Sequence, residues 1–593
     1  MSFKVNYMGE ALERISLDVL SQSGEVTPDS PSSVTVSKTI EPIGSIVVPN
    51  KPEVMLVLPP LYQTGRMPDY NPKEPMGLMY LASSLRRDGR SVELFDADFA
   101  AKTPEEVIDE ITRANPPVVG FSVFQRALPS FEKIVTGLRQ NGYRGHVTCG
   151  GITPTLSHPY ILERLGDKVD SIVLGEGEET LRQLVGRLAE GDNWQTLPSI
   201  AWRDDKGSVV NLPAGVVNLD EIPFAARDRV DDYLAKTNYA TIIGSRGCYG
   251  ACSFCANYSF ETAHRGPRWR PRRPATVVDE MGGLYQEHGV TVFKFNDPNM
   301  FGPGLEGVEH VRQIAQGVID RGLPLHLMGF CRGNDLTADP TILPVMRRAG
   351  FERLLVGIES SDDAVLRQFK KGETIAGMDR AVELVAENNM STVIGFMIFN
   401  PYTTLDSIKR DLNYLRERQF TPALSKSLRV FDGTPIQREL EQEGRLIKQN
   451  PFEGYHNYVM PREVAAVYGS MKLLFTHCLD KIRAVGQDKI LNIKKAPSFY
   501  ERQNFNSLSE AFFSVEADFL DRLVHLAENP GFVLGDVRHL IGRAYQDLTI
   551  ICRVIGIDPK EMSAPERVTS EVYTMMKEKP FNTFREEYRW NED

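Results

Sequence analysis

The sequence has few cysteines, no long apolar run and no excess of positive charge. Seven cysteines in 593 residues are too few for a disulfide framework and favour a reducing compartment. No apolar run approaches the roughly 20 residues that span a bilayer, and the first residues, M-S-F-K-V-N-Y, lack the apolar core of a signal peptide. The formal net charge of −11 gives no general attraction to nucleic acid or acidic lipid. We therefore expect a cytoplasmic protein without a membrane span or a nucleic-acid partner.

Three of the cysteines lie together in one glycine-rich loop. Residues 244–260 read G-S-R-G-C-Y-G-A-C-S-F-C-A-N-Y-S-F, with Cys248, Cys252 and Cys255 at C-x3-C-x2-C spacing. Three thiolates on so short a loop can hold three irons of a [4Fe–4S] cluster, and one iron stays open because no fourth ligand lies nearby. The apolar run at 239–243 is typical of a buried strand, so we expect the cluster at the end of a strand.

Two other interpretations of the three cysteines are weaker. Zinc usually takes four Cys or His ligands in paired spacing, and no second pair follows. An odd, closely spaced trio in a cysteine-poor chain also argues against disulfides. The motif resembles the signature of the radical S-adenosylmethionine (SAM) enzymes, including the aromatic residue Phe254 before the third cysteine. The resemblance implies that the open iron chelates the amino and carboxylate groups of SAM.

Strand and helix patterns alternate between residues 51 and 195, after an extension at 1–50. Apolar segments typical of strands recur at 53–58, 91–95, 118–123, 146–149 and 171–173. This alternation predicts a doubly wound parallel sheet, which binds ligands at the carboxyl ends of its strands. The small or polar residues at these ends are Asp96, Ser122, Gly150, Gly151, Thr153, Gly175, Glu176, Gly177 and Glu178.

Four segments of this region resemble the cobalamin-binding domain that precedes many radical SAM domains. They read E-P-M-G-L-M-Y-L-A-S-S-L-R-R-D-G, G-F-S-V-F, C-G-G-I-T-P-T and V-L-G-E-G-E-E-T-L. The resemblance implies that the nucleotide tail of cobalamin enters the cleft beside Ser122, Gly150 and Gly151. The D-x-H-x-x-G motif of enzymes with histidine on cobalt is absent, so we expect no histidine ligand. We expect the loop at 61–70 to cover the lower face of the corrin, with Tyr62, Arg66 and Met67 nearest to it. The alternative is that these three are solvated loop residues.

A related family, the radical SAM methylthiotransferases, holds a second cluster on three cysteines in its first domain. Residues 1–235 of this chain contain only Cys149. A second cluster therefore cannot be built here, and this alternative is disfavoured.

Residues 236–430 carry the periodicity of a partial TIM-like barrel with six β-α units. Active sites of such barrels lie at the carboxyl ends of the strands, where the polar loops of this region fall. As ionised groups, Asp297 and Glu359 accept hydrogen bonds from the SAM amino group or ribose. Arg332 is expected to form a two-pronged contact with the SAM carboxylate. The alternative for each carboxylate is a structural cap on a loop, and this chain has N-D-P-N where related proteins commonly have G-G-E.

The remaining segments are a linker at 196–235 and a mainly helical domain at 431–593, which we expect to cap the barrel and set the substrate. The linker contains S-I-A-W-R-D-D-K-G-S, which is typical of a hairpin strand and its turn. Residues 265–273, R-G-P-R-W-R-P-R-R, are the one basic and aromatic stretch. Nucleic-acid binding is one interpretation of such a stretch. We favour cofactor or interdomain contacts for Arg270 and Arg272.

The combined resemblance is to the cobalamin-dependent radical SAM enzymes, most closely to their methyltransferases. It implies cleavage of SAM to a 5′-deoxyadenosyl radical, removal of hydrogen from a substrate carbon, and delivery of a methyl group from cobalamin. The expected partners are a small-molecule or carrier-bound substrate and an electron donor of the flavodoxin or ferredoxin type. Two alternatives stay open, a cyclase or ring-rearranging enzyme with the same cofactors, and a cobalamin-carrying sensor without enzymatic activity.

Overall fold

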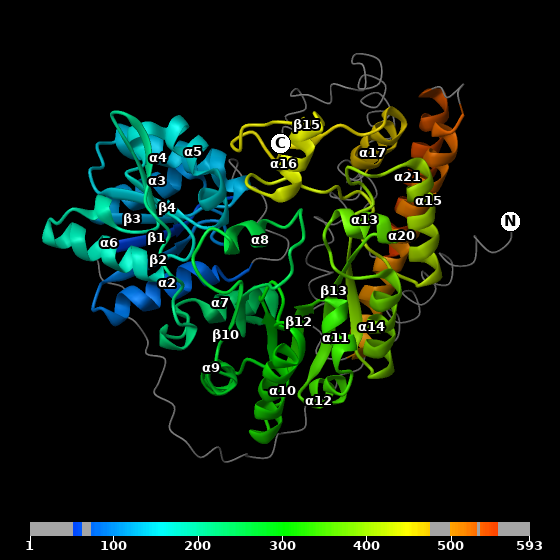
Figure 1. Ribbon diagram of the computed structural model, residues 1–593, viewed down its shortest axis with the longest axis horizontal. Coiled ribbons are helices and arrows are strands. Elements are labelled where there is room, and N and C mark those ends of the chain that lie inside the picture. The colour runs from blue at the N-terminus through cyan, green and yellow to red at the C-terminus, as the bar shows by residue number, and fades with distance from the viewer. Residues whose placement is uncertain (1–50, 62–72, 475–498, 530–533, 555–593) are drawn as a thin grey trace.

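The computed structural model describes residues 51–61, 73–474, 499–529 and 534–554, and Figure 1 shows their arrangement. A sheet of seven strands with its helices forms one end of the molecule, a sheet of five strands forms the middle, and long helices stand at the other end. Tyr62, Arg66, Met67 and the extension at 1–50 lie outside the described residues.

The first sheet has the predicted doubly wound form. Five parallel strands lie in the order β2-β1-β3-β4-β5. Their bounds are β1 Val54–Leu58, β2 Val92–Asp96, β3 Val118–Ser122, β4 His146–Gly150 and β5 Ser171–Val173. The antiparallel strands β6 (Ile200–Asp204) and β7 (Gly207–Val210) continue the sheet beyond β5. The hairpin expected in the linker is thus part of the first sheet.

Helices cover both faces of this sheet. Successive side chains of a strand point to opposite faces, and β1 shows the result. Met55 and Val57 pack with α3, α4 and α5, whereas Leu56 and Leu58 pack with α2 and α6. The helix bounds are α2 Met76–Arg87, α3 Pro104–Ala114, α4 Leu128–Gln140, α5 Ile152–Leu165 and α6 Glu178–Glu190. Burial on both faces explains why the strand reads as one apolar run.

The second sheet is a parallel, partial barrel, ordered β14-β13-β12-β11-β8. Its strands are β8 Ala240–Ile242, β11 Val292–Phe295, β12 His326–Cys331, β13 Phe351–Glu359 and β14 Ser391–Phe396. The surrounding helices are α7 Val230–Thr237, α9 Pro274–His288, α10 Gly304–Asp320, α11 Gly333–Ala338, α12 Ile342–Arg348, α13 Asp363–Gln368, α14 Ile375–Glu387 and α15 Leu405–Glu417. In the described part of the chain, the expected sixth strand is reduced to a single parallel bridge between Phe399 and Ser427.

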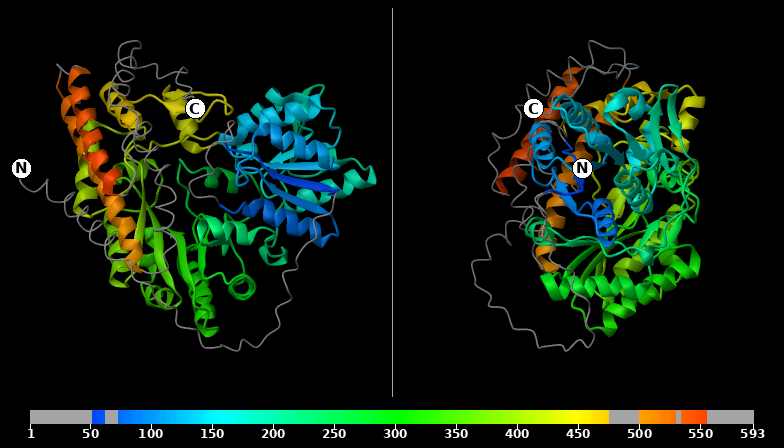
Figure 2. Two further views of the ribbon diagram at one scale, coloured as in Figure 1. Left: turned by 180° about the vertical axis from the view of Figure 1, so that it is seen from behind. Right: turned by 90° about the vertical axis from the view of Figure 1, so that its left-hand side faces the viewer.

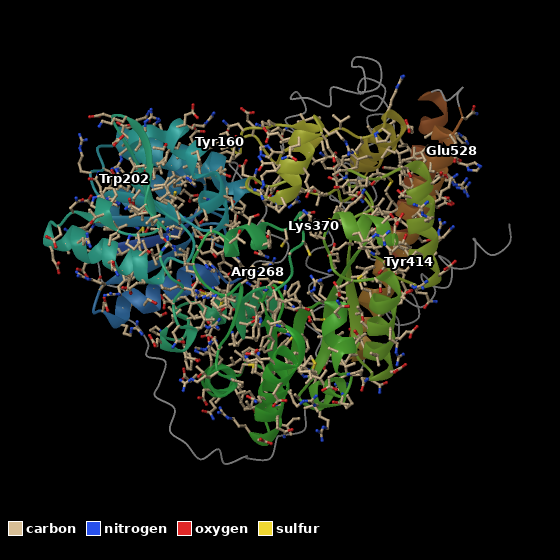
Figure 3. All side chains as sticks on the ribbon, viewed as in Figure 1. Tyr160, Trp202, Arg268, Lys370, Tyr414 and Glu528 are labelled. Carbon is tan, nitrogen blue, oxygen red and sulfur yellow. The ribbon has the colours of Figure 1, made fainter. Side chains whose placement is uncertain are left out.

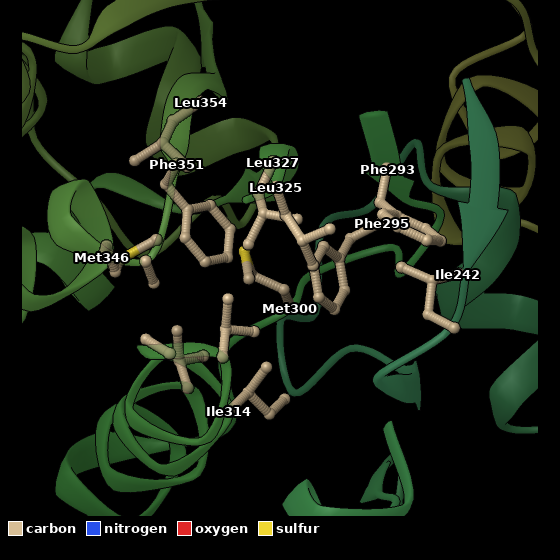
Figure 4. Packing of buried hydrophobic residues seen from close by; sticks show 14 of the residues in the cluster. Ile242, Phe293, Phe295, Met300, Ile314, Leu325, Leu327, Met346, Phe351 and Leu354 are labelled. Carbon is tan, nitrogen blue, oxygen red and sulfur yellow. The ribbon is translucent and has the colours of Figure 1, made fainter. Parts of the chain in front are cut away.

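Large apolar side chains fill the space between this sheet and its helices. Phe293, Phe295 and Phe351 are fully buried there, and the rings of Phe295 and Phe351 stack with centroids 5.8 Å apart. Ile314 of α10 and Met346 of α12 close the cluster from the helix side (Figure 4). The alternate residues of the same strands face the inside of the barrel.

The cluster loop sits between the two sheets. Strands β9 (Ser245–Gly247) and β10 (Trp269–Pro271) pair as a short antiparallel ribbon. Helix α8 (Ala256–Glu261) lies between them in sequence. Part of the basic stretch is therefore strand β10. Helix α8 packs against α5 of the first domain, and Figure 1 shows it between the two domains.

Helices at the carboxyl-terminal side pack against the barrel. Their bounds are α16 Pro435–Gln442, α17 Arg462–Leu474, α20 Phe499–Ala527 and α21 Leu534–Val554, with a small hairpin of β15 Leu446–Ile447 and β16 Asn457–Tyr458. Helix α20 lies along α15 and α17, and Figure 2 shows α20 and α21 on the side of the barrel away from the first domain. No helix among the described residues has the length and apolar character needed to cross a bilayer.

Candidate functional site

The three cysteines of the motif converge beyond β8. Cys252 is buried and the other two are partly buried. The Cys255 amide donates to the Cys252 carbonyl at 3.1 Å, and the Gly250 amide donates to Cys248 Sγ at 3.3 Å. Burial, with a smaller contribution from the charges of Cys252 and Cys248, raises the pKa of Cys255 to about 11. The three thiols therefore lie close enough to act on one another electrostatically.

Arg332 reaches into this loop from the end of β12. Its Nη1 donates to Cys252 Sγ at 3.6 Å, and a side chain at Gly250 would come within 2.5 Å of that nitrogen. Its Nη2 donates to the Lys371 carbonyl and lies 3.3 Å from Glu373. Only Nε is buried without a hydrogen-bond partner. Both terminal nitrogens of Arg332 are thus engaged by the protein, and its two-pronged contact with a SAM carboxylate stays a prediction.

Asp297 is turned toward the backbone of the cluster loop. It accepts hydrogen bonds from the Gly244 amide at 2.9 Å, the Ser245 amide at 2.6 Å and the Ser245 hydroxyl at 2.8 Å. Burial raises its pKa to about 7 although these hydrogen bonds lower it. The geometry is that of the structural cap considered as an alternative, and a SAM contact by Asp297 stays a prediction.

Glu359 lies at the barrel mouth with a left-handed backbone, φ +72°. Its carboxylate folds over Gly357, where a side chain would come within 2.4 Å of Oε1. Lys371, which is only 5% exposed, places its Nζ 4.0 Å from Glu359 and 2.9 Å from Glu373. A bulky residue at φ above zero is strained, and such strain is often found at functional sites. Burial raises the pKa of Glu359, and Lys371 opposes that rise.

The predicted cobalamin-side residues meet at the carboxyl edge of the first sheet. Gly151 has φ +103°, and a side chain there would lie 3.6 Å from Ser122 Oγ. The Gly175 amide donates to Thr155 Oγ1 at 2.9 Å, which ties the G-E-G-E loop to α5. Thr153 is buried in the first turn of α5. The structure thus brings Ser122, Gly150, Gly151 and Gly175 together.

Phe124, two residues after Ser122, was not predicted from the sequence as a site residue. It is 52% exposed, at the place where strand order reverses between β1 and β3. Ligands of doubly wound sheets bind at this point. An apolar ring exposed there is an additional candidate for contact with the flat face of a ligand.

Glu176 forms ion pairs with arginines of the barrel domain. It pairs with Arg246 at 3.0 Å and, through both oxygens, with Arg270 at 2.9 and 2.7 Å. Arg246 also pairs with Glu178 at 2.5 Å. Burial raises the pKa of Glu176, but the two guanidiniums outweigh it and lower the pKa overall. The interdomain contact expected of Arg270 is confirmed, with Glu176 as its partner, and a cofactor contact by Glu176 stays a prediction.

A second buried network joins the same domains. Glu74 accepts from Arg227 at 2.8 Å and from the Thr241 amide at 2.6 Å. Arg227 continues to Glu280 at 3.0 Å, and Glu280 accepts from Arg272 at 2.7 Å. Each of these ionic groups is paired, as burial requires. Arg270 and Arg272 of the basic stretch thus make buried internal contacts, as the interdomain interpretation expects.

Comparison with known proteins matches both domains. Residues 70–185 match the B12 binding domain, and residues 242–415 match the radical SAM superfamily. The chain belongs to the cobalamin-dependent radical SAM enzymes. The cofactors expected from the sequence, a [4Fe–4S] cluster, SAM and cobalamin, are confirmed at the level of these two domains.

The relatives of this radical SAM enzyme include different activities. One is an anaerobic magnesium-protoporphyrin IX monomethyl ester cyclase from Synechocystis, 28% identical over 62% of this chain and 70% of its own. Another is an uncharacterized methyltransferase from Pyrococcus horikoshii, 26% identical over 65% and 82%. A solved structure of the cobalamin-dependent SAM radical enzyme OxsB with aqua-cobalamin covers 89% of this chain and 84% of its own, with 18% identity and a TM-score of 0.70. That likeness shows the shared fold.

The residues present fit the three cofactors. Cys248, Cys252 and Cys255 lie on one short loop, and no side chain at Gly250 fills the space beside Cys248 and Arg332. The buried Nε of Arg332 has no partner in the described structure, as expected for a donor that meets a ligand. On the other domain, Gly151 takes a backbone conformation that a side chain would strain, beside Ser122.

Proposed function

We propose that this enzyme is a methyltransferase that moves a methyl group from SAM, by way of cobalamin, to a carbon of an organic substrate. The relationship to the Pyrococcus horikoshii methyltransferase supports it, because that relative is matched over most of its length. One observation carries the proposal. Glu176, at the carboxyl edge of the cobalamin sheet, forms ion pairs with Arg246 of β9 and Arg270 of β10, the two strands that flank the cysteine loop.

The chain's own residues hold and orient the reacting groups. When bound, the cofactors supply one-electron cleavage of SAM and methyl transfer through cobalt. The three cysteines hold the cluster, and Asp297 holds the backbone that leads to them. Glu359, supported by Lys371, presents a carboxylate at the barrel mouth. An electron donor of the flavodoxin or ferredoxin type completes the proposal.

The inside of the barrel suggests what kind of substrate fits. Phe330, Leu355 and Val393 are register neighbours on β12, β13 and β14, and they face away from the packed helices. Val393 is 41% exposed, and the other two are partly exposed. Lys294, on the adjacent strand, holds its ammonium 5.4 Å from the Phe330 ring. We therefore propose a small organic or carrier-bound substrate with an apolar body.

Product analysis from SAM carrying a deuterated methyl group tests the proposal. Such a methyltransferase uses one SAM as methyl donor and cleaves another to the 5′-deoxyadenosyl radical. We therefore expect S-adenosylhomocysteine and 5′-deoxyadenosine together, with the label in the product. The triple variant C248A/C252A/C255A should form neither. Formation of 5′-deoxyadenosine with an unlabelled product would reject methyl transfer.

A cyclase is the second candidate, and the Synechocystis relative favours it. Such an enzyme uses the same cofactor domains, so the described site residues do not separate the two. The cyclase predicts 5′-deoxyadenosine without S-adenosylhomocysteine. The same labelling experiment therefore decides between them.

A further inference from the structure

Arg332 is held beside the cluster cysteines by contacts at both terminal nitrogens and over one face of its guanidinium. Arg332 is 7% exposed, and the central carbon of its guanidinium lies 5.4 Å from the centroid of the Tyr249 ring. The backbone amide of Arg332 donates to the Asp335 carboxylate at 3.0 Å, and the Tyr249 hydroxyl donates to the same carboxylate at 2.5 Å. A guanidinium fixed in this way has little freedom to turn toward other partners. Its place next to Cys252 is therefore determined by the protein itself.

The contact with sulfur is enforced by the shape of the loop. Nη1 lies 3.6 Å from Cys252 Sγ, in a space bounded by Gly250. A side chain at Gly250 would come within 2.5 Å of Nη1 and 3.3 Å of Cys248 Sγ. The glycine thus keeps open the gap through which Arg332 meets the thiols. Electrostatics agree, because the Arg332 charge lowers the pKa of Cys248, whereas burial raises it and prevails.

The donors of Arg332 are already divided between partners. Nη2 contacts the Lys371 carbonyl and Glu373, and Nη1 contacts the thiol. The two terminal nitrogens are therefore engaged by the protein, while Nε is buried without a hydrogen-bond partner among the described residues. Hydrogen bonds to cluster sulfurs and local charge set the reduction potential of iron–sulfur centres.

We propose that Arg332 is a positioning residue that tunes the reduction potential of the cluster through its hydrogen bond to Cys252. The reduced cluster carries one more negative charge than the oxidised cluster. A nearby cation that donates to a ligand sulfur stabilises the reduced form and raises the potential. The inference rests on the cluster assignment, but it requires neither cobalamin nor methyl transfer.

The test is a potentiometric titration of the cluster, followed by electron spin resonance in the absence of SAM. Leaving SAM out separates a contact with sulfur from a contact with the SAM carboxylate. We expect R332Q to shift the midpoint to a more negative potential and R332K to shift it by a smaller amount. Iron and sulfide content, measured on each variant, shows whether the cluster is intact.

Arg268 provides the matched control. Its Nη1 donates at 2.8 Å to the carbonyl of Gly250, in the same loop, and its guanidinium lies over the Tyr258 ring (Figure 3 labels Arg268). R268Q should leave the potential unchanged, because no sulfur loses a donor. Wild-type potential in R332Q, or an equal shift in R268Q, would overturn the proposal. If R332Q assembles no cluster, R332K decides, and a wild-type potential in R332K has the same meaning.

Discussion

The Glu176 carboxylate and the Arg270 guanidinium form a two-pronged ion pair across the domain interface, with contacts of 2.9 and 2.7 Å. Both side chains are about nine-tenths buried. Breaking a buried pair leaves an uncompensated charge, which typically costs about 3 to 5 kcal/mol. We expect E176Q to lower the thermal midpoint of unfolding by several degrees.

Glu179, on the following helix, is the control for this prediction. It pairs with Arg182 at the surface, where both side chains are substantially exposed. Exposed pairs contribute about 1 kcal/mol or less. E179Q should therefore unfold close to the wild-type temperature, and an equal loss in both variants would show that Glu176 has no special place at the interface.

The buried carboxyl group of Asp297 should make stability depend on pH. Its folded pKa of about 7 lies above the ordinary value of 3.8, because burial disfavours the charged form. The contribution of this group to the free energy of unfolding is complete below the ordinary pKa and is lost as the pH rises toward 7. Relative to D297N, which does not titrate, the cluster-free wild-type protein should be more stable at pH 5 than at pH 8. The slope within the window approaches about 1.4 kcal/mol per pH unit. A difference between the two proteins that does not change with pH contradicts the assignment.

The triple variant C248A/C252A/C255A should lose the iron and the broad visible absorbance of the cluster. Cys331 is the control, because it is 5% exposed, packs in the barrel core, and has a pKa that burial raises well above the ordinary value. C331A should keep its iron. Iron retained by the triple variant would end the cluster assignment.

The cobalt of bound cobalamin should have no histidine ligand from the first domain. His146 contacts Ser171 at 2.8 Å, and His158 contacts the Thr155 carbonyl at 3.1 Å. Burial lowers the pKa of His146 to about 4, which marks it as a neutral interior residue. Spin resonance of the Co(II) form should therefore lack nitrogen splitting, and a clear splitting would contradict this prediction.

Gly151→Val should weaken cobalamin binding at least tenfold, because a branched side chain is strained at φ +103°.

Much of the architecture was readable from periodicity and loop chemistry. The apolar runs of the first domain became strands buried on both faces, and the apolar run at 239–243 correctly predicted the strand, β8, that precedes the cysteine loop. Such features are local, so a short window of sequence contains them. The hairpin of β6 and β7 was also expected, but its pairing with β5 is a long-range property.

The directions of polar side chains were harder to predict. Asp297 lies at the expected strand end but turns to Gly244 and Ser245, which precede it by more than 50 residues. Glu176 lies in the expected loop but pairs with arginines 70 and 94 positions later. Lys371 gave no signal, because nothing in K-K-G-E tells that one lysine is buried and its neighbour is exposed. Partners of this kind come from tertiary packing, which a single sequence does not display.

We expect cobalamin and the cluster to occupy one shared site between the two sheets. Spin resonance of protein that holds both Co(II) cobalamin and the reduced cluster measures this most directly. We predict that each signal broadens and relaxes faster when the other centre is paramagnetic, and that the effect disappears in C248A/C252A/C255A. A spectrum equal to the sum of two unperturbed signals would contradict the claim.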